Sequence, residues 1–186
     1  MHTRRGFTKR LVALALSVTA ATGAATALAA PAAQASDLGG RITRSEVISR
    51  AQYWVDHQPG DYNQKANGPD QDGRMYRRDC SGYVSMAWHL TTSLSTATLP
   101  GVSHQISRDD LKAGDILDYA GTHTILFDHW TDSNGHFLYY TFGATPVRHL
   151  TGSIGAASID GHPNGSYRAY RYENIVDDVV VPPPPV

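Results

Sequence analysis

A single cysteine, Cys80, provides the only thiol in the 186 residues of this chain. No intramolecular disulfide can form, so the fold cannot rely on one for its stability. The length allows one compact domain with a substantial core and little room for a second. A formal net charge of −1 indicates no basic surface for nucleic acid or for anionic membranes, so we expect neither as a partner.

The first 35 residues have the composition of an export signal. A basic start with the pair Arg4-Arg5 precedes an apolar, alanine-rich stretch, and Ala33-Gln34-Ala35 offers the small residues that a signal peptidase requires. We expect a signal peptide over 1–35, one catalytic domain over 36–178 and a stiff proline-rich tail over 179–186. The arginine pair fits a twin-arginine signal and an ordinary basic start equally well. The mature protein is expected to be secreted, extracellular or in the cell wall, monomeric and without a membrane anchor.

The domain begins with a predicted packing helix. Thr43-Arg44-Ser45-Glu46 matches a capping box, and the helix is expected to stop at Pro59-Gly60. Residues 61–74 are mainly Asn, Gln, Asp, Gly and Pro, which predicts a long loop. Within it, Asp70-Gln71-Asp72-Gly73 lacks the remaining ligands and the closing glutamate of a calcium loop, so no metal is expected.

Cys80 lies at the start of the next predicted helix. The residues that follow it on one helical face are Val84, Ala87, Trp88 and Thr91. A thiol there feels the positive end of the helix dipole, and Arg77 and Arg78 add positive potential, which favours the nucleophilic thiolate. A lone cysteine can also be an inert buried residue. In an exported protein, however, an unpaired thiol is a liability unless it has a function, which favours a catalytic Cys80.

The C-terminal half predicts β-strands. Residues with a strand pattern are 116–120, 123–130, 136–142 and 167–172. In the second of these, His123, Ile125 and Phe127 share one face, and Asn134-Gly135 predicts a hairpin to the third. The last of these segments is expected to be an edge strand or the final strand, and 152–165 is expected to be a loop.

His123 is the candidate general base. A cysteine nucleophile needs a base within hydrogen-bond reach, and a helix packed on an antiparallel sheet can bring the start of a strand beside it. The other histidines lie in the signal, in expected loops, at the turn or too far along the same helix or strand: His2, His57, His89, His104, His129, His136, His149 and His162. Only His149 among them is not excluded by its position.

Three segments resemble, in the same order, the motifs of the NlpC-type cell-wall cysteine peptidases, a bacterial branch of the papain-like superfamily. Asp79-Cys80-Ser81-Gly82-Tyr83-Val84 resembles the Asp-Cys-Ser-Gly-aromatic-Val motif of that family. Leu111-Lys112-Ala113-Gly114-Asp115-Ile116-Leu117 resembles its Leu-x-x-Gly-Asp-hydrophobic segment, and His123-Thr124-Ile125-Leu126-Phe127 resembles its histidine strand. The resemblance covers residues 61–144.

The resemblance implies an α+β, papain-like fold in which N-terminal helices, including the nucleophile helix, pack on a central antiparallel β-sheet. It implies a Cys80 nucleophile, a His123 base, and substrate-binding or orienting roles for Tyr62, Asp79 and Ser81. The implied activity is that of a thiol peptidase or amidase that hydrolyses the peptide stem of peptidoglycan without a cofactor. A catalytically inactive wall-binding relative and a thiol-dependent acyltransferase are the alternatives.

Members of that family usually place a third polar residue opposite the histidine on the following strand, where it orients the imidazole. With the turn at Asn134-Gly135, this position falls at Gly143, which has no side chain to offer. The nearest polar side chains on that face are Thr141 and Thr145. We therefore expect His123 to be loosely held and turnover to be slow, and we expect Gly143→Glu to raise activity.

Overall fold

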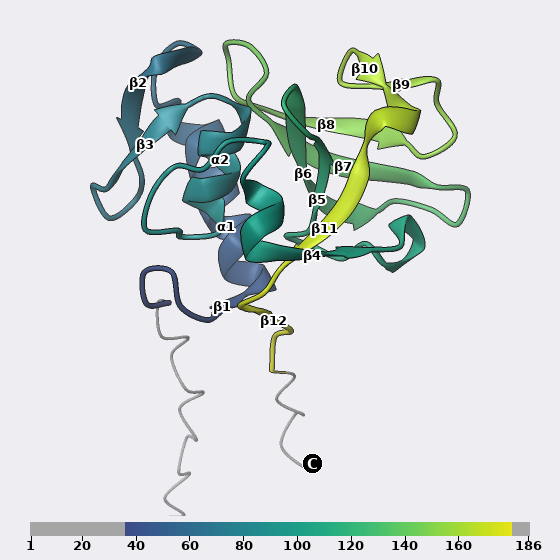
Figure 1. Cartoon of the computed structure of the whole chain (residues 1–186), viewed down its shortest axis with the longest axis horizontal. Helices are drawn as coiled ribbons and strands as arrows, with labels where there is room; N and C mark the ends of the chain where they lie inside the picture. The colour runs from purple at the N-terminus through teal and green to yellow at the C-terminus, as the bar shows by residue number, and fades with distance from the viewer. Residues whose placement is uncertain (1–35, 180–186) are drawn as a thin grey trace, which may run out of the picture. The chain divides into compact units, whose positions relative to one another are not determined.

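The computed structural model describes residues 36–179, so the expected signal peptide and nearly all of the expected tail lie outside the described residues. The described chain is a mixed structure of two α-helices and a mostly antiparallel sheet, as an α+β fold requires (Figure 1). The helices, α1 (Arg44–His57) and α2 (Cys80–Ala87), pack against each other beside the sheet. No helix within residues 36–179 is long and apolar enough to cross a membrane.

Six strands form the central antiparallel sheet, in the order β4-β11-β5-β6-β7-β8. Their bounds are β4 (Ser103–Ile106), β5 (Ile116–Tyr119), β6 (His123–Trp130), β7 (His136–Thr141), β8 (Arg148–Ser153) and β11 (Arg168–Tyr172). β11 lies between β4 and β5, so the prediction of an edge strand is wrong, although β11 is the final strand of this sheet in chain order. The neighbour that covers it, β4, comes from a connection without strand periodicity, which the sequence pattern does not reveal.

Hairpins of short strands lie in or beside both segments that were expected to be loops, and a third short pair lies elsewhere in the chain. The pairs are the β2 (Asn63–Pro69) and β3 (Met75–Arg78) hairpin, the β9 (Ser158–Ile159) and β10 (His162–Pro163) hairpin, and parallel β1 (Ile42–Thr43) with β12 (Ile175–Val176). Three short 3-10 helices complete the chain: η1 (Leu99–Val102), η2 (Arg108–Asp110) and η3 (Asn164–Ser166). The hairpin strands are rich in polar residues, glycine and proline, which hide a strand pattern.

The start of α1 confirms half of the predicted capping box. Thr43 Oγ1 accepts the backbone N–H of Glu46 at 3.2 Å, which satisfies one of the free donors of the first turn. The Glu46 carboxylate does not return to Thr43 and instead accepts the backbone N–H of Ser36 at 3.0 Å and its hydroxyl at 2.7 Å. Glu46 therefore ties Ser36, the first residue that the structure describes, to α1.

Helix α2 is buried on all sides, so the prediction of an amphipathic helix is wrong. All eight of its residues are buried, and it ends at Ala87, which leaves Thr91 outside the helix and exposed. It lies between α1 and the sheet, where the Tyr83 hydroxyl donates to the Ala51 carbonyl at 2.7 Å. Beyond its end, the Trp88 indole N–H donates to the Gly114 carbonyl at 2.8 Å. Both ends of α2 are thus attached to other elements.

The two faces of the sheet bury separate apolar clusters. Leu126 of β6 packs with Trp54, Tyr83 and other residues of the helix side. Ile125 and Phe127 pack on the opposite side. The prediction that His123, Ile125 and Phe127 share a face is consistent with this alternation, although β6 is buried on both faces rather than on one.

A buried carboxylate, that of Asp115, joins the start of α1 to the sheet. It accepts hydrogen bonds from Arg44 Nη1 at 3.1 Å and from Arg171 Nη2 at 2.7 Å, and its side chain is fully buried.

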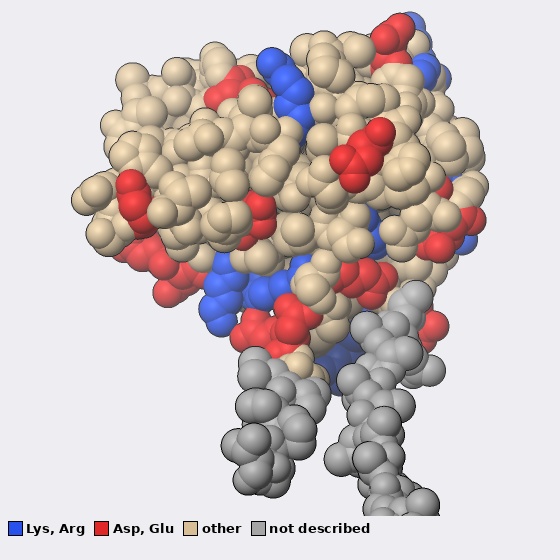
Figure 2. All heavy atoms as spheres, turned by 180° about the vertical axis from the view of Figure 1, so that it is seen from behind, with Lys and Arg blue, Asp and Glu red and all other residues tan. Residues whose placement is uncertain are grey.

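On the face opposite that of Figure 1, acidic and basic side chains lie intermixed, mainly along the lower edge (Figure 2). The charges there compensate one another rather than forming a patch of one sign.

A second ion-pair cluster is centred on Arg50, whose side chain is fully buried within the helix side of the fold. Its Nη2 pairs with the buried carboxylate of Asp70, Nη1 donates to Asp72 at 3.0 Å, and Nε donates to the Met86 carbonyl at 3.1 Å. The guanidinium thereby links α1, the turn between β2 and β3, and the C-terminal part of α2.

We expect Arg50→Met to lower the free energy of unfolding by about 3 to 5 kcal/mol, because it leaves the Asp70 carboxylate buried without its cation. Urea denaturation followed by circular dichroism would measure the loss. Ser49→Ala, at an exposed position of the same helix, serves as the control and should stay within about 0.5 kcal/mol of the wild type. Adding Asp70→Asn to Arg50→Met should recover part of the loss. A change of under about 1 kcal/mol for Arg50→Met would show that this cluster does not hold the helices.

Candidate active site

The structure confirms that Cys80 is the first residue of α2. Asp79 is the N-cap, and its carboxylate accepts the backbone N–H of Gly82 at 2.7 Å. A Cβ added at Gly82 would lie 1.9 Å from the Arg77 carbonyl oxygen, so only glycine allows β3 to run this close to the helix. Cys80 itself is 6 % exposed. The thiol is therefore held at the positive end of a buried helix, where negative charge is stabilised.

Cys80 lines a pocket of about 300 Å³. The other lining residues come from β2, β3, α2 and two connections: Gln64, Arg77, Asp79, Ser81, Ser95, Thr96, Gly121 and Thr122. Gly121 and Thr122 directly precede His123, so this pocket places the N-terminus of α2 next to the start of β6. Most of its wall is polar and uncharged, which suits a peptide backbone.

His123 is the first residue of β6 and is buried, with 3 % exposure. Its Nε2 lies 2.7 Å from Asp160 Oδ2, and the Thr141 hydroxyl donates to the same carboxylate oxygen at 2.6 Å. Because Nε2 is engaged by Asp160, Nδ1 is the ring nitrogen left for the Cys80 thiol. Thiol, imidazole and carboxylate thus occur in the order in which a nucleophile, a base and an orienting group act.

Asp160 and Cys80 both influence the protonation of His123. Burial alone would lower the pKa of this imidazole, but hydrogen bonding to Asp160 and to the Cys80 thiol, together with Coulombic attraction to both, raises the pKa to about 9. For Asp160, burial opposes the shift, and the bonds from His123 and Thr141 prevail and lower the pKa of its carboxyl. At neutral pH the pair is therefore an imidazolium and a carboxylate.

Gly143 lies beside the imidazole, as the hairpin arithmetic predicts. The pairing of Leu126 with Tyr140 in the β6–β7 register, continued along both strands, sets His123 opposite Gly143. A Cβ added at Gly143 would lie 3.0 Å from His123 Cε1 and 3.4 Å from Asp160 Oδ2. The space that a side chain at this position would fill is therefore used by the Asp160 carboxylate.

Asp160 is the site residue that sequence reasoning missed. It lies in the turn of the β9–β10 hairpin, where Asp160 and Gly161 both have positive φ, at 48° and 78°. An Asp-Gly pair is typical of such two-residue hairpin turns and was the available signal, but the flanking strands are only two residues long. The expectation of a loosely held His123 is therefore corrected, because a hairpin further along the chain supplies the orienting carboxylate.

Tyr62 does not line the pocket that contains Cys80. Its ring packs edge-on against Phe142, with centroids 5.7 Å apart, and its hydroxyl accepts a hydrogen bond from Gln64 at 3.0 Å. Burial raises the pKa of Tyr62, the hydrogen bond from Gln64 opposes the change, and Coulombic interactions with Cys80 and Asp79 add to it. The substrate-binding or orienting role that the resemblance implies for Tyr62 stays a prediction.

Asp79 and Ser81 both line the pocket, but their polar atoms already have partners. Arg77 Nε pairs with the Asp79 carboxylate, and Arg77 Nη2 donates to Ser81 Oγ at 2.8 Å and to the Leu94 carbonyl at 2.8 Å. The positive potential expected from Arg77 is thus compensated by Asp79. The three side chains form a rigid wall beside the thiol rather than a set of free binding groups.

Most of the other candidate histidines within residues 36–179 are engaged elsewhere. Their partners are Tyr53 for His57, Ser36 for His89, Glu173 for His104, Asp128 for His129 and His149, and Asp132 for His136. His149, which the sequence pattern left open as a base, also stacks on Tyr140 with centroids 4.0 Å apart. His123 is the histidine that the structure brings to Cys80.

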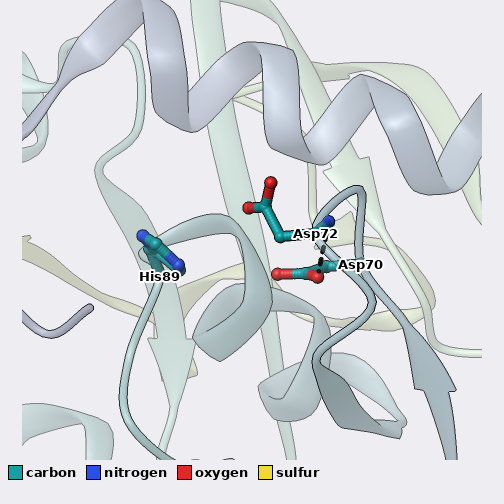
Figure 3. A group of neighbouring side chains, drawn as sticks. All are labelled: Asp70, Asp72 and His89. Atoms are coloured by element: carbon teal, nitrogen blue, oxygen red, sulfur yellow. Dashed lines mark hydrogen bonds between the residues drawn. The ribbon is translucent and has the colours of Figure 1, made fainter. Parts of the chain in front are cut away.

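Asp70, Asp72 and His89 form a group whose ligand atoms lie within 4.8 Å of one another (Figure 3). Asp70 Oδ1 accepts the Asp72 backbone N–H at 2.9 Å, and both carboxylates pair with Arg50. The guanidinium already supplies the cation that these carboxylates need. We therefore assign them to the support of α2 and place no metal there.

Comparisons of this chain with family models, with curated proteins and with solved structures gave no match.

We expect the free-energy difference between wild type and Asp160→Asn to depend on pH. The pKa of His123 rises from 6.5 to about 9 on folding, so the pair stabilises the protein fully below about pH 6.5 and loses this contribution as the pH rises through about 9. The difference should reach at most about 3 kcal/mol on the acid side of this window, above the pH at which Asp160 itself takes up a proton. Urea denaturation at a series of pH values would measure it.

Asp132→Asn is the matched control for this series, because Asp132 and His136 are also 2.7 Å apart but both are exposed. Its effect on the free energy of unfolding should vary little over the same range. A difference for Asp160→Asn that stays constant with pH would show that Asp160 does not hold the His123 proton.

We expect Gly143→Ala to slow alkylation of Cys80 by iodoacetamide by at least about threefold, because the new Cβ presses on His123 Cε1 and misplaces the imidazole. We also no longer expect Gly143→Glu to raise activity. It should lower activity, because the new carboxylate would compete with Asp160 for the His123 ring. Gly165→Ala, with no atom within 4 Å of its added Cβ, is the control and should react like the wild type. Wild-type reactivity of Gly143→Ala would mean that the imidazole does not need this space.

Proposed function

We propose that this chain is a secreted cysteine peptidase or amidase of papain-like architecture that hydrolyses the peptide stem of peptidoglycan. The observation that carries the proposal is the placement of Cys80 at the start of a buried helix beside an imidazole that Asp160 holds by its far nitrogen. That arrangement provides a nucleophile, a base and an orienting acid from three separate parts of the chain.

The chemistry follows from the charges of the site. The Cys80 thiolate attacks the carbonyl carbon of the substrate, and backbone N–H groups at the start of α2 receive the negative charge that develops on the carbonyl oxygen. Loss of one such donor typically costs about 2.7 to 4 kcal/mol of barrier. The His123 imidazolium gives its proton to the leaving amine, and the neutral imidazole then removes a proton from water, which releases the acyl group from sulfur. Asp160 keeps Nδ1 directed at the reacting atoms in both steps.

The choice of peptidoglycan rests on the resemblance of three segments to NlpC-type peptidases and on the export signal expected at the N-terminus. The pocket beside Cys80 agrees with a peptide substrate, because Gln64, Thr96 and Thr122 offer uncharged hydrogen-bonding groups to an extended backbone. The papain-like architecture rests on the same resemblance and on the packing of the cysteine helix beside an antiparallel sheet.

The Asp160 carboxylate also bears on the alternatives. An inactive wall-binding relative would have no need of a buried acid, 2.7 Å from the imidazole, that fixes its tautomer. An acyltransferase would use the same groups and transfer the acyl chain to an amine instead of water. Hydrolase is therefore the function that we place first, and transferase is separated from it by the products.

We expect the mature protein to release stem-peptide fragments from purified peptidoglycan, and mass analysis of the fragments would identify the bond that is cut. Cys80→Ala should abolish release, and His123→Ala should lower it at least about a hundredfold, the usual worth of a positioned base. His149→Ala is the matched control and should retain activity, because the His149 ring stacks on Tyr140 and its Nε2 lies 2.9 Å from Asp128 Oδ2.

Fragments that gain an added amine would assign transferase activity. A loss of less than about tenfold in His123→Ala would remove this residue from the role of base. No release by a folded wild-type protein would contradict the proposed substrate.

A further inference from the structure

A second imidazole, that of His162, lies on the face of His123. The two rings are stacked with centroids 4.9 Å apart and planes 29° apart. His162 also packs edge-on against the Tyr119 ring, with ring centroids 6.3 Å apart. His162 follows Asp160 by two residues, so both come from the same hairpin. The Asp160 carboxylate contacts the edge of the His123 ring, and the His162 ring stacks on its face.

The titratable groups that face His162 are Tyr119 of β5, His123 of β6 and Asp160 of its own hairpin. Of the two stacked imidazoles, His123 holds the proton, since its Nε2 is the atom 2.7 Å from the Asp160 carboxylate. Burial and the positive charge of His123 lower the pKa of His162, and Asp160 opposes them. A neutral ring thus lies on a cationic one, and aromatic faces attract cations at this separation.

We infer that His162 is a positioning residue for His123: while neutral it packs on the imidazolium and keeps that ring aligned between Asp160 and the Cys80 thiol, and when protonated in acid it releases the alignment. The inference rests on the cysteine chemistry proposed above, but the geometry that it describes can be measured without a substrate. It assigns to the β9–β10 hairpin a second contribution to the site in addition to Asp160.

The reason for the release is electrostatic. Two imidazolium rings stacked at 4.9 Å repel each other, and the low exposure of His123 leaves little water to screen the repulsion. The single Asp160 carboxylate cannot compensate two cations. Protonation of His162 therefore turns a contact that holds the His123 ring into one that displaces it.

The first test is the rate at which iodoacetamide alkylates Cys80 near neutral pH. His162→Ala removes the stacked ring and should slow alkylation at least about fivefold, whereas His162→Phe keeps a ring and should stay within about twofold of the wild type. The matched controls are His57→Ala and His57→Phe, since His57 stacks on Tyr53 at 4.1 Å on α1. Both controls should react like the wild type.

The second test follows the ring protons of His123 by NMR over pH. In the wild type their chemical shifts should change once when His123 itself titrates and a second time in the pH range where His162 takes up its proton. This second step should be absent in His162→Phe. A purely structural contact would not produce such a step. Asp118→Asn removes the other nearby group that titrates near neutrality, because burial raises the pKa of Asp118 to about 7.

Circular dichroism must first show that the variants are folded, and His162→Gln replaces His162→Ala if the latter is not. Alkylation of Cys80 in His162→Ala at the wild-type rate would overturn the inference. A second titration step of His123 that persists in His162→Phe would also overturn it. If these results hold while peptidoglycan is not cleaved, the positioning role stands and the proposed function fails. If the wild type cleaves peptidoglycan while the substitutions leave alkylation unaffected, the proposed function stands and the positioning role fails.

Discussion

The buried guanidinium of Arg50 is the charge on which the placement of α2 depends. It joins α1 to the Asp70 carboxylate in the β2–β3 turn and to the Met86 carbonyl near the end of α2. A buried charge that loses its partner is costly, so these three elements cannot move apart independently. At the other end of α2, Asp79 caps the first turn and pairs with Arg77. A helix of eight buried residues is thereby held at both ends, and the thiol at its start has one position relative to the sheet.

The group formed by Cys80, His123 and Asp160 is assembled from separate segments of the chain. Helix α2 carries Cys80, the start of β6 carries His123, the end of β7 carries Thr141, and the β9–β10 hairpin carries Asp160. The absence of a side chain at Gly143 leaves room for this assembly, since a Cβ there would lie 3.0 Å from His123 Cε1 and 3.4 Å from Asp160 Oδ2. An orienting group that is missing from the neighbouring strand has thus been supplied by a later hairpin, which fits into the space left free.

Local features could be predicted from the sequence because their causes are local. The helix that begins at Cys80, the strand that begins at His123 and the turn at Asn134-Gly135 depend on capping, periodicity and turn chemistry within a few residues. The interior position of β11 was mispredicted because it depends on β4, a strand without a pattern of its own. The burial of α2 on all sides depends on how many elements surround it, and the spacing of apolar residues within the helix does not indicate this.

The sequence by itself determined that a lone cysteine starts a helix, that a histidine starts a strand, and that position 143 lies opposite that histidine. Each of these follows from periods and turn lengths that act along a short stretch of chain. Only the tertiary structure decided what orients His123, because Asp160 comes from 37 residues further along and reaches it through a hairpin of two-residue strands. The stacking of His162 was decided in the same way, since contact between side chains distant in sequence is a property of packing and leaves no periodic trace.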